Sequence, residues 1–523
     1  MPERTPHVNP QDRSPHRRPG PVSPSVVRRR GCRTTGALLA AVLGAGLLTG
    51  LTSAPSPARA GEEATGARPV ADTPPVKPAE GSSARPAACP DDLRGLASCY
   101  AGQDRNGAHY TVAVPEKWNG DLVLHAHGGP DLEAPGPERS AEDLERWSVM
   151  VKEGYAWAGS SFRRGGYGAR MAAADTERLR RLFRTDFARP GRTLLHGQSW
   201  GGDVAAKAAE TYGARSERPV YDGVLLTNGL VAGASRGYDY RVDLRVVYQY
   251  FCGNHPRPSE PQYPLWQGLP ADSTMTSADL KARVQECTGV ESEPEDRTAR
   301  QQRNLSAILG VVQVPERTLV SHLNFATFTF RDIVHQRLDG RNPFGNRGVR
   351  YSGSPDDRAL NAGVQRFSAD PSARRDLSYD SDLTGRIRVP VLTLHAIDDP
   401  TVFVEHESAY RASVEGAGRG RHLVQTFTKE SEHSALSDSG YAAAVRSLAS
   451  WVDTGRKPVP GQVAERCTDA DATYGTGCFF DSGYRPGSYA SRVDPRPGGL
   501  RWPAMTAAQE RVWSRIEGVG IAP

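Results

Sequence analysis

Apolar runs bounded by polar and glycine-rich turns recur along the chain and predict buried strands. They are found at residues 122–126, 154–161, 192–196, 221–227, 389–395 and 422–428. Helical stretches follow three of them, at residues 203–211, 404–414 and 441–451. The run at residues 389–395 is nearly unbroken and β-prone, which is typical of a parallel strand covered on both faces.

One of these strands leads into a helix through a glycine-rich turn that contains a serine. The turn reads GQSWG at residues 197–201, a G-x-S-x-G pattern, between the strand at residues 192–196 and the helix at residues 203–211. In such a turn the serine hydroxyl points out of the sheet edge, and the glycines let strand and helix pack closely. In another context the same letters would be an ordinary turn with a surface serine. Between this strand and this helix they predict that Ser199 is a nucleophile.

A second glycine-rich turn follows the first of the predicted strands. It reads HGGP at residues 127–130, about 70 residues before Ser199. Glycines allow backbone N–H groups to approach a reacting carbonyl without obstruction by side chains. The turn therefore predicts an oxyanion hole formed by the N–H of Gly128 or Gly129 and by that of Trp200, the residue after the serine.

The strand at residues 389–395 ends in a turn with two adjacent acids, Asp398 and Asp399. An acid at this position accepts a hydrogen bond from a catalytic imidazole, fixes its tautomer and stabilises the imidazolium. We expect Asp399, which directly precedes Pro400, to do this. Asp398 is then expected to be a turn or capping residue.

Three histidines follow these acids, and the general base is expected among them because the triad order is serine, acid, histidine. His406 lies in the helix at residues 404–414, too close to the acid in sequence to loop back. His422 begins the last predicted strand. His433 comes after that strand and before the helix at residues 441–451. This position predicts that His433 is the general base.

With these residues in place, the chain resembles the α/β-hydrolase fold family, specifically its secreted bacterial serine-hydrolase branch. The resemblance spans roughly residues 105–230 and 386–455, and it is carried by residues 115–122, 127–130, 154–161 and 197–201 and by Asp399 and His433. It implies an α/β fold with a mostly parallel central sheet flanked by helices. It also implies that Ser199 is the nucleophile, His433 the general base and Asp399 its orienting acid. A serine at this turn argues against dehalogenase or epoxide-hydrolase chemistry, which this fold performs with a carboxylate nucleophile.

The first 60 residues have the composition of an export signal. Residues 1–35 are polar and basic, residues 36–51 are apolar, and Ala58-Arg59-Ala60 offers a small-x-small cleavage site. An apolar stretch of 16 residues is shorter than the ~20 residues that a membrane span needs. We therefore expect a signal peptide, using the Sec or the Tat route, and no stable membrane anchor.

The leader also accounts for the basic character of the chain. The formal net charge is +5, but residues 1–60 hold nine arginines against Glu3 and Asp12 and contribute +7, which leaves the remainder near −2. No cluster of Lys and Arg interleaved with aromatic residues occurs in that remainder. The charge is therefore no argument for nucleic acid as a partner.

Cysteine usage agrees with export. Of seven cysteines, loss of Cys32 with the leader leaves six, which allow fifteen pairings. They fall into three couples that are close in sequence: Cys89 and Cys99, Cys252 and Cys287, and Cys467 and Cys478. These couples predict three disulfides, since the C-x-x-C or histidine spacing of a zinc site is missing.

The remaining patterns predict how the chain is divided. We expect a signal peptide (1–60), a flexible linker (61–88), the first part of the core (89–229), a lid or cap insertion (230–385), the second part of the core (386–457) and a C-terminal appendage (458–523). The insertion has helical character at residues 244–251, 278–285 and 296–309. It predicts a largely helical lid over Ser199, with a separate linker-bound domain as the alternative. The appendage, with a closing helix near residues 507–516, has no predicted role.

The sequence gives the least information about the substrate. Arg163 and Arg164 follow the strand at residues 154–161 and are candidates for holding a substrate carboxylate, although solvated surface arginines give the same pattern. Four insertion residues are candidates for an acyl pocket or for ordinary packing: Tyr248, Tyr250, His255 and Trp266. Neither the type of ester nor the oligomeric state is indicated.

Together these patterns predict a secreted serine hydrolase that cleaves ester or amide bonds of small extracellular substrates through an acyl-enzyme. No cofactor is expected, because side chains, backbone dipoles and water supply the chemistry. The HGGP turn and the letters SWGG at residues 199–202 also resemble proline iminopeptidases, although Asp131 stands where those carry another glycine. A third hypothesis is a non-catalytic binding protein with the same fold.

Overall fold

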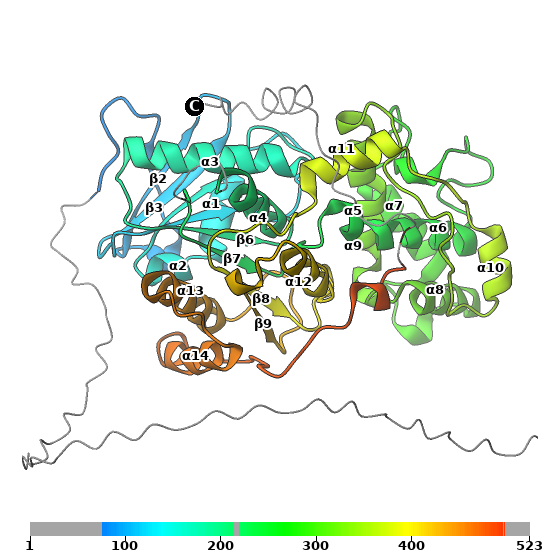
Figure 1. Ribbon diagram of the computed structural model, residues 1–523. Coiled ribbons are helices and arrows are strands. Elements are labelled where there is room, and N and C mark those ends of the chain that lie inside the picture. The colour runs from blue at the N-terminus through cyan, green and yellow to red at the C-terminus, as the bar shows by residue number, and fades with distance from the viewer. Residues whose placement is uncertain (1–75, 214–218, 495, 497–523) are drawn as a thin grey trace, which may run out of the picture. The chain divides into compact units, whose positions relative to one another are not determined.

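The computed structural model describes residues 76–213, 219–494 and 496, which lie in one compact unit. Its strands are β1 (Arg85–Ala87), β2 (Ala97–Gln103), β3 (His109–Pro115), β4 (Leu122–Ala126), β5 (Ala156–Ser160), β6 (Thr193–Gln198), β7 (Gly223–Thr227), β8 (Val391–Ala396) and β9 (Leu423–Thr428). In the described residues they form one nine-stranded sheet in the order β1-β2-β3-β5-β4-β6-β7-β8-β9 (Figure 1). Strands β4 to β9 pair in parallel, whereas β1, β2 and β3 pair antiparallel with their neighbours.

The parallel strands are buried on both faces, as their apolar runs predict. Every residue of β4, β6, β7, β8 and β9 is buried. Because successive side chains of a strand point to opposite faces, Leu122 and Leu124 join one hydrophobic cluster and Val123 joins another. The prediction of a mostly parallel sheet is confirmed, and the antiparallel strands β1 to β3 extend it at one edge.

Helices cover both faces of the sheet (Figure 1). One face is covered by α3 (Ala169–Asp186), α4 (Trp200–Tyr212) and α12 (His406–Gly416), and the other by α1 (Glu138–Arg146), α2 (Val149–Lys152) and α13 (Asp438–Thr454). Short 3-10 helices are η1 (Asp91–Leu93) and η7 (Gly420–His422). A mostly parallel sheet with helices on both faces and a serine at the turn from strand to helix is the α/β-hydrolase fold, as the resemblance implies.

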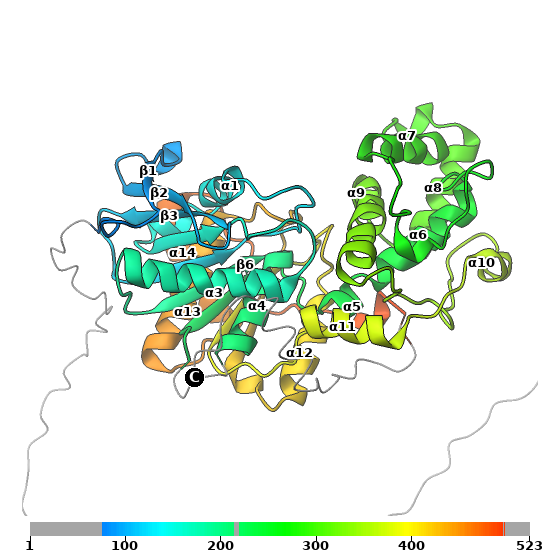
Figure 2. The same cartoon turned by 90° about the horizontal axis from the view of Figure 1, so that it is seen from above.

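The insertion between β7 and β8 is largely helical. Its α-helices are α5 (Ala234–Gly237), α6 (Asp239–Cys252), α7 (Ser277–Thr288), α8 (Ala299–Val312), α9 (Leu319–Asn324), α10 (Asp357–Gly363) and α11 (Pro371–Ser381). Short helices are η2 (Leu265–Gln267), η3 (Pro294–Asp296) and η4 (Glu316–Thr318), and two π-helical segments are η5 (Phe325–Thr329) and η6 (Asp332–Arg337). Helices α7 and α8 pack on each other, and α6 packs on α8, α9 and η5 (Figure 2). The three stretches with predicted helical character lie mostly within α6, α7 and α8.

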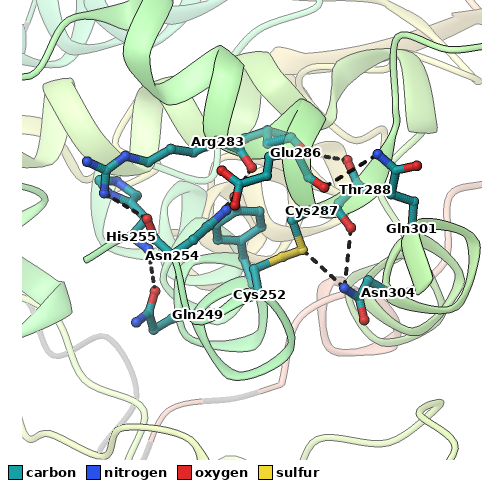
Figure 3. Close-up of a disulfide and its surroundings, with 12 residues drawn as sticks. Gln249, Cys252, Asn254, His255, Arg283, Glu286, Cys287, Thr288, Gln301 and Asn304 are labelled. Atoms are coloured by element: carbon teal, nitrogen blue, oxygen red, sulfur yellow. Dashed lines mark hydrogen bonds between the residues drawn. A yellow bond between two sulfur atoms is a disulfide. The ribbon is translucent and has the colours of Figure 1, made fainter. Parts of the chain in front are cut away.

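A disulfide joins two helices of the insertion at their ends. Cys252, the last residue of α6, is bonded to Cys287 near the end of α7, with their Cα atoms 5.6 Å apart. The side-chain amide of Asn304 donates to both the Sγ and the backbone oxygen of Cys287 at 3.3 Å (Figure 3). On the same segment, Arg283 Nη1 donates to the backbone oxygen of Asn254 at 2.7 Å. The disulfide thus closes the proline-rich connection between α6 and α7.

The N-terminal segment joins the sheet earlier than expected. Within the expected linker (61–88), Arg85–Ala87 form β1 and pair with β2, and Cys89 is disulfide-bonded to Cys99 on β2. Residues 85–87 are therefore part of the sheet, which composition does not reveal, because pairing with an edge strand is a long-range interaction. The expected signal peptide (1–60) lies outside the described residues.

The C-terminal appendage contacts both the core and the insertion. Its first helix, α14 (Pro460–Tyr474), packs on α13, and Cys467 is disulfide-bonded to Cys478. After η8 (Tyr489–Ser491), Arg496 Nη2 donates to Asp243 on α6 at 2.8 Å. The expected helix near residues 507–516 lies outside the described residues. Among the residues that the structure describes, no helix combines the length and apolar character that crossing a membrane requires.

Candidate active site

Ser199 stands at the sharp turn between β6 and α4. Its φ is 59° and its ψ is −127°, a positive-φ conformation that costs a non-glycine residue about 1–3 kcal/mol. The N–H of Ser199 donates to the carbonyl oxygen of Thr227 at 3.1 Å, and its carbonyl oxygen accepts the N–H of Leu230 at 2.8 Å. These two bonds hold the strained residue at the carboxyl end of the parallel strands.

The neighbouring glycines leave no room for a side chain. A Cβ on Gly197 would lie 2.1 Å from the carbonyl oxygen of Gly201, and one on Gly201 would lie 2.1 Å from that of Ala126. A Cβ on Gly202 would lie 2.7 Å from the Cα of Gly229. The turn, α4 and the loop after β7 therefore approach each other as closely as bare backbone allows, which explains the glycines around the serine.

His433 lies between Ser199 and Asp399. Its Nε2 is 2.7 Å from the Ser199 Oγ, and its Nδ1 is 2.8 Å and 3.0 Å from the two carboxylate oxygens of Asp399. Asp399 is only 3% exposed, whereas His433 is half-buried. A proton on Nδ1 directed at the carboxylate leaves Nε2 as the acceptor that faces the serine hydroxyl. The fold thus brings the three predicted triad residues together.

The two adjacent acids after β8 differ in their surroundings. Asp399 is buried, and its Oδ1 also accepts the N–H groups of Thr401 at 2.8 Å and Val402 at 3.0 Å. Asp398 is exposed. Of the two, Asp399 is therefore the acid that contacts His433, and its own turn holds it in place.

A second buried histidine supports this turn. His395, near the end of β8, donates from Nε2 to the carbonyl oxygen of Val402 at 2.9 Å, and its Nδ1 lies 3.2 Å from Glu407 Oε1. Burial alone lowers the pKa of His395, but the hydrogen bond and negative charge of Glu407 outweigh burial, so this pKa is raised. Sequence reasoning missed the pair, because Glu407 lies on α12 and reaches β8 only in the folded chain.

Two buried amides hold the loop that carries His433. The Gln198 Nε2 donates to the backbone oxygen of His433 at 2.8 Å and to Ser434 Oγ at 2.9 Å. The Asn228 Nδ2 donates to the same oxygen of His433 at 2.7 Å, and its Oδ1 accepts the N–H of Ala396 at 2.7 Å. Sequence reasoning missed both residues. The only available signals were the place of Gln198 inside the motif and of Asn228 at a strand end.

The turn after β4 lies against the serine. A Cβ on Gly128 would come within 3.2 Å of the Ser199 Cβ. The Arg139 Nη2 donates to the carbonyl oxygen of Gly128 at 2.8 Å, so in this trans peptide the N–H of Gly129 points away from Arg139. Within the described residues, the N–H groups of Gly128, Gly129 and Trp200 donate to no backbone acceptor.

A cavity of about 330 Å³ opens beside Trp200. The loop after β4 lines it together with Phe162 and Arg164. Arg163 points elsewhere, because its Nη1 lies 3.5 Å from Asp175 Oδ1. Of the two arginines proposed from the sequence to hold a carboxylate, Arg164 is thus the one that lines this cavity.

The insertion reaches the triad through His322 on α9. Its Nε2 donates to the carbonyl oxygen of Pro400, next to Asp399, at 3.0 Å. Burial lowers the pKa of His322 to about 3, and the charges of Arg241 and His433 act in the same direction. His322 is therefore a neutral group in contact with the turn that carries the acid.

The remaining candidates take no part in the Ser199–His433–Asp399 arrangement. His406 is buried in α12 and accepts the N–H of Ala232 at 3.3 Å, and His422 lies in η7. The four insertion candidates differ in burial: Tyr248 and His255 are buried, Trp266 is half-buried and Tyr250 is exposed.

The three side chains lie in a hydrogen-bonded row beside backbone N–H groups. A hydroxyl faces an imidazole nitrogen, the other nitrogen faces a buried carboxylate, and a glycine turn lies against the hydroxyl. These are the parts that attack of an alcohol on an acyl carbon requires. No group of three or more potential metal ligands occurs among the described residues.

Comparisons with known proteins give distant likenesses. No family model matches the chain. An o-phthalyl amidase from Xanthobacter agilis is 28% identical over 118 residues, which are 22% of this chain and 24% of that protein. The chain therefore matches about a quarter of the length of this relative.

Two solved structures illustrate the structural likenesses. The rice cell wall degrading esterase LipA from Xanthomonas oryzae is 16% identical, with a TM-score of 0.33 and coverage of 69% of this chain and 90% of that one. Candida antarctica lipase A is 11% identical, with a TM-score of 0.39 and coverage of 73% and 83%. Both likenesses are distant.

Proposed function

We propose that this chain is a serine hydrolase that cleaves ester or amide bonds of small extracellular substrates. One observation carries the proposal: Ser199 Oγ lies 2.7 Å from His433 Nε2, and His433 Nδ1 lies 2.8 Å from Asp399. The relative named as an amidase supports testing amides beside esters.

In the first step His433 accepts the proton of Ser199 as its Oγ attacks the acyl carbon. The step needs this base because an unassisted serine hydroxyl is a poor nucleophile. Asp399 stabilises the imidazolium and fixes the tautomer. The N–H groups of Thr401 and Val402 already orient the carboxylate, so it need not move during the reaction.

The N–H of Trp200 and that of Gly128 or Gly129 stabilise the negative charge on the former carbonyl oxygen. Each such donor typically lowers the barrier by about 3–4 kcal/mol. His433 then protonates the leaving alcohol or amine, which departs and leaves an acyl-Ser199. Water activated by His433 releases the acid and restores the serine.

The insertion is assigned the role of a lid over this site. Its first residues contact the nucleophile through the bond from Leu230 N–H to the Ser199 carbonyl oxygen. Its α9 contacts the acid turn through His322 and Pro400. A lid that excludes water strengthens electrostatic interactions at the reacting groups.

Export through the N-terminal signal is part of the proposal. The three disulfides of the described residues are compatible with it, because disulfides form and persist in oxidising compartments.

Two buried acids of the insertion are not free to bind the N-terminal ammonium group that an aminopeptidase recognises. An enzyme that recognises a free N-terminus needs an acid to bind the ammonium group. The buried acids Asp239 and Asp243 of α6 are already occupied, because Arg496 lies 3.7 Å and 2.8 Å from them. Tyr351 also donates to Asp243 at 2.7 Å.

The test is covalent labelling of the full chain with a fluorophosphonate, followed by mass-spectrometric mapping of the modified peptide. We expect one label, at Ser199, together with turnover of short-chain nitrophenyl esters. In Ser199→Ala both should vanish, since loss of a triad nucleophile costs roughly six orders of magnitude in turnover. The exposed Ser431→Ala variant should behave like the parent.

Other outcomes would change the assignment. Turnover limited to aminoacyl anilides with a free amino group would indicate an aminopeptidase. A folded chain that neither reacts with the label nor hydrolyses any ester or anilide would contradict the hydrolase and favour the binding protein.

A further inference from the structure

Helix α6 carries two acids and two arginines, and within the described residues only the acids form ion pairs. Asp239 and Asp243 lie 3.7 Å and 2.8 Å from the guanidinium of Arg496. Arg241 and Arg245, also one turn apart, are 2% and 1% exposed. The Nε of Arg241 and the Nε and Nη1 of Arg245 have no hydrogen-bond partner in the described part of the chain.

Among the described residues, each of the two arginines makes one side-chain hydrogen bond, and in both cases the acceptor is a neutral group. Arg245 has a hydroxyl partner, since its Nη2 donates to Tyr263 at 3.3 Å. Arg241 makes one long hydrogen bond, from Nη1 to the carbonyl oxygen of Gly237 at 3.4 Å. A guanidinium cannot lose its proton in a protein, and a buried charge without a counter-ion is strongly unfavourable. A bound anion would therefore stabilise the buried charge of Arg241.

Three aromatic rings surround this guanidinium. The Arg241 Cζ lies 4.3 Å from the ring centroid of Phe325, 4.7 Å from that of Tyr240 and 5.2 Å from that of Tyr238. Ring faces attract a cation and orient it, but they supply no negative charge. Phe325 begins the π-helical segment η5, and π-helical turns are rare and frequent at functional sites.

The rings of Phe325, Tyr240 and Tyr238 form an aromatic cage around Arg241. A row of ring contacts links this cage to the nucleophile. The ring of Tyr238 packs on that of Tyr167 at 5.6 Å, and the ring of Tyr167 packs on that of Trp200 at 5.7 Å. Trp200 directly follows Ser199. One wall of the cage is thus connected to the proposed oxyanion hole.

The opposite wall of the cage is linked to the acid. The ring of Tyr240 packs on that of His322 at 5.4 Å. His322 in turn donates to the carbonyl oxygen of Pro400, beside Asp399, at 3.0 Å. Arg241 therefore lies between elements that contact both ends of the triad.

We propose that Arg241 binds a carboxylate of the substrate, so that the preferred substrates are esters or amides that carry a free carboxylate near the bond that Ser199 attacks. This inference rests on the proposed function. The planar fork of a guanidinium matches a carboxylate in two parallel hydrogen bonds. Such a ligand would satisfy Arg241 and neutralise its buried charge. The cage would then bind anionic substrates more tightly than neutral ones.

The kinetic test compares matched neutral and anionic esters on the full chain. One arm places the charge on the acyl half (4-nitrophenyl butyrate against 4-nitrophenyl hydrogen glutarate). The other arm places it on the leaving group (phenyl butyrate against 4-carboxyphenyl butyrate). The arm in which the anionic ester has the higher kcat/KM identifies the half of the substrate that meets Arg241.

In Arg241→Met we expect kcat/KM for that anionic ester to fall about 10- to 100-fold, because a charge-assisted hydrogen bond to a buried group is lost. The neutral ester and the rate of fluorophosphonate labelling should stay nearly unchanged, which also shows that the variant folds. Arg241→Lys should recover part of the loss. Arg303→Met, an exposed arginine on α8, removes the same charge and should change neither rate. Equal losses for neutral and anionic esters, or no loss in either arm, would overturn the proposal.

A binding measurement separates this proposal from the hydrolase itself. Calorimetry would measure the Kd of 4-nitrophenyl hydrogen glutarate and of 4-carboxyphenyl butyrate for Ser199→Ala. We expect the Kd of the preferred ester to rise about 10- to 100-fold when Arg241→Met is added. An unchanged Kd would refute the carboxylate site even if esters are hydrolysed. Conversely, Arg241-dependent binding by a parent chain without turnover or labelling would retain the site and refute the hydrolase.

Discussion

Ser199 owes its orientation to residues that are distant in the sequence. Its positive φ of 59° is strained by about 1–3 kcal/mol. Thr227 accepts its N–H, Leu230 donates to its carbonyl oxygen, and Gly201 lets the turn approach Ala126. Tertiary contacts thus hold the hydroxyl toward His433.

Asn228 should act on the reaction through the position of His433. In Asn228→Ala the backbone oxygen of His433 loses one donor and the N–H of Ala396 loses its acceptor. Because each lost hydrogen bond of this kind costs about 1–2 kcal/mol, we expect kcat to fall about tenfold or more with little change in KM. Steady-state kinetics with a nitrophenyl ester, taken as a pH profile, would measure both effects.

The matched control for Asn228 is a half-buried amide of the insertion. Gln249 donates to Pro256 and accepts from His255, and Gln249→Ala should leave kcat and its pH profile unchanged. A kcat of Asn228→Ala equal to that of the parent would refute the positioning role. So would an equal loss of kcat in both variants.

At the scale of elements, the connection between α6 and α7 depends on its disulfide. Cys252 and Cys287 are 35 residues apart, and the chain-entropy model assigns such a cross-link about 4 kcal/mol. In Cys252→Ser/Cys287→Ser we expect the amides of α6 and α7 to exchange hydrogen faster. Hydrogen exchange followed by mass spectrometry would locate the change.

The third disulfide offers a matched comparison. Cys467 and Cys478 are 11 residues apart, which corresponds to about 3 kcal/mol. Their replacement by serine should accelerate exchange in α14 and leave the insertion protected. If the two double variants gave the same exchange pattern, the disulfides would not act locally and the prediction would fail.

At the scale of the whole molecule, buried neutral histidines should make the fold sensitive to acid. Burial lowers the pKa of five of them: His127, His196, His255, His322 and His406. For His322 the folded-state pKa is about 3, against an unfolded value of about 6.5. As the pH falls below about 6.5, this histidine is protonated in the unfolded chain but stays neutral in the folded chain. The free energy of unfolding therefore decreases until the pH reaches about 3.

The variant His322→Gln isolates one of these contributions. Glutamine keeps a donor for the carbonyl oxygen of Pro400 but does not titrate. As the pH falls from 6 to 4, we expect the free energy of unfolding of the variant to decrease less steeply than that of the parent. The two slopes should differ by about 1.4 kcal/mol per pH unit. Urea titrations at several pH values would measure the slope. Parallel curves for parent and variant would contradict the prediction.

Buried acids have the opposite effect on the pH dependence of stability. Burial raises the pKa of Asp203 on α4 and of Asp380 and Asp382 at the end of the insertion. Their folded-state pKa exceeds the unfolded value, so the stability they provide is lost as the pH rises from about 4 through the raised pKa. The comparison of parent and His322→Gln cancels this contribution.

The amino-acid sequence by itself determined the features that depend on neighbours along the chain. Apolar runs were enough to locate β4 and β6 to β9, because burial on both faces requires them. The turn at Ser199 and the order of acid and histidine predicted His433 and narrowed the acid to Asp398 or Asp399, with Asp399 preferred. The fold brings these residues together, while their catalytic role stays a prediction.

Only the tertiary structure decided how polar and charged groups are paired. Whether Asp398 or Asp399 meets His433 depends on which of them the turn buries. The two amides on the histidine loop and the unpaired charge of Arg241 are equally invisible in the sequence. The physical reason is that hydrogen bonds and ion pairs act over a few ångströms between segments far apart in the chain. Local patterns reveal burial, but the partners of a buried polar group are known only when the chain has folded.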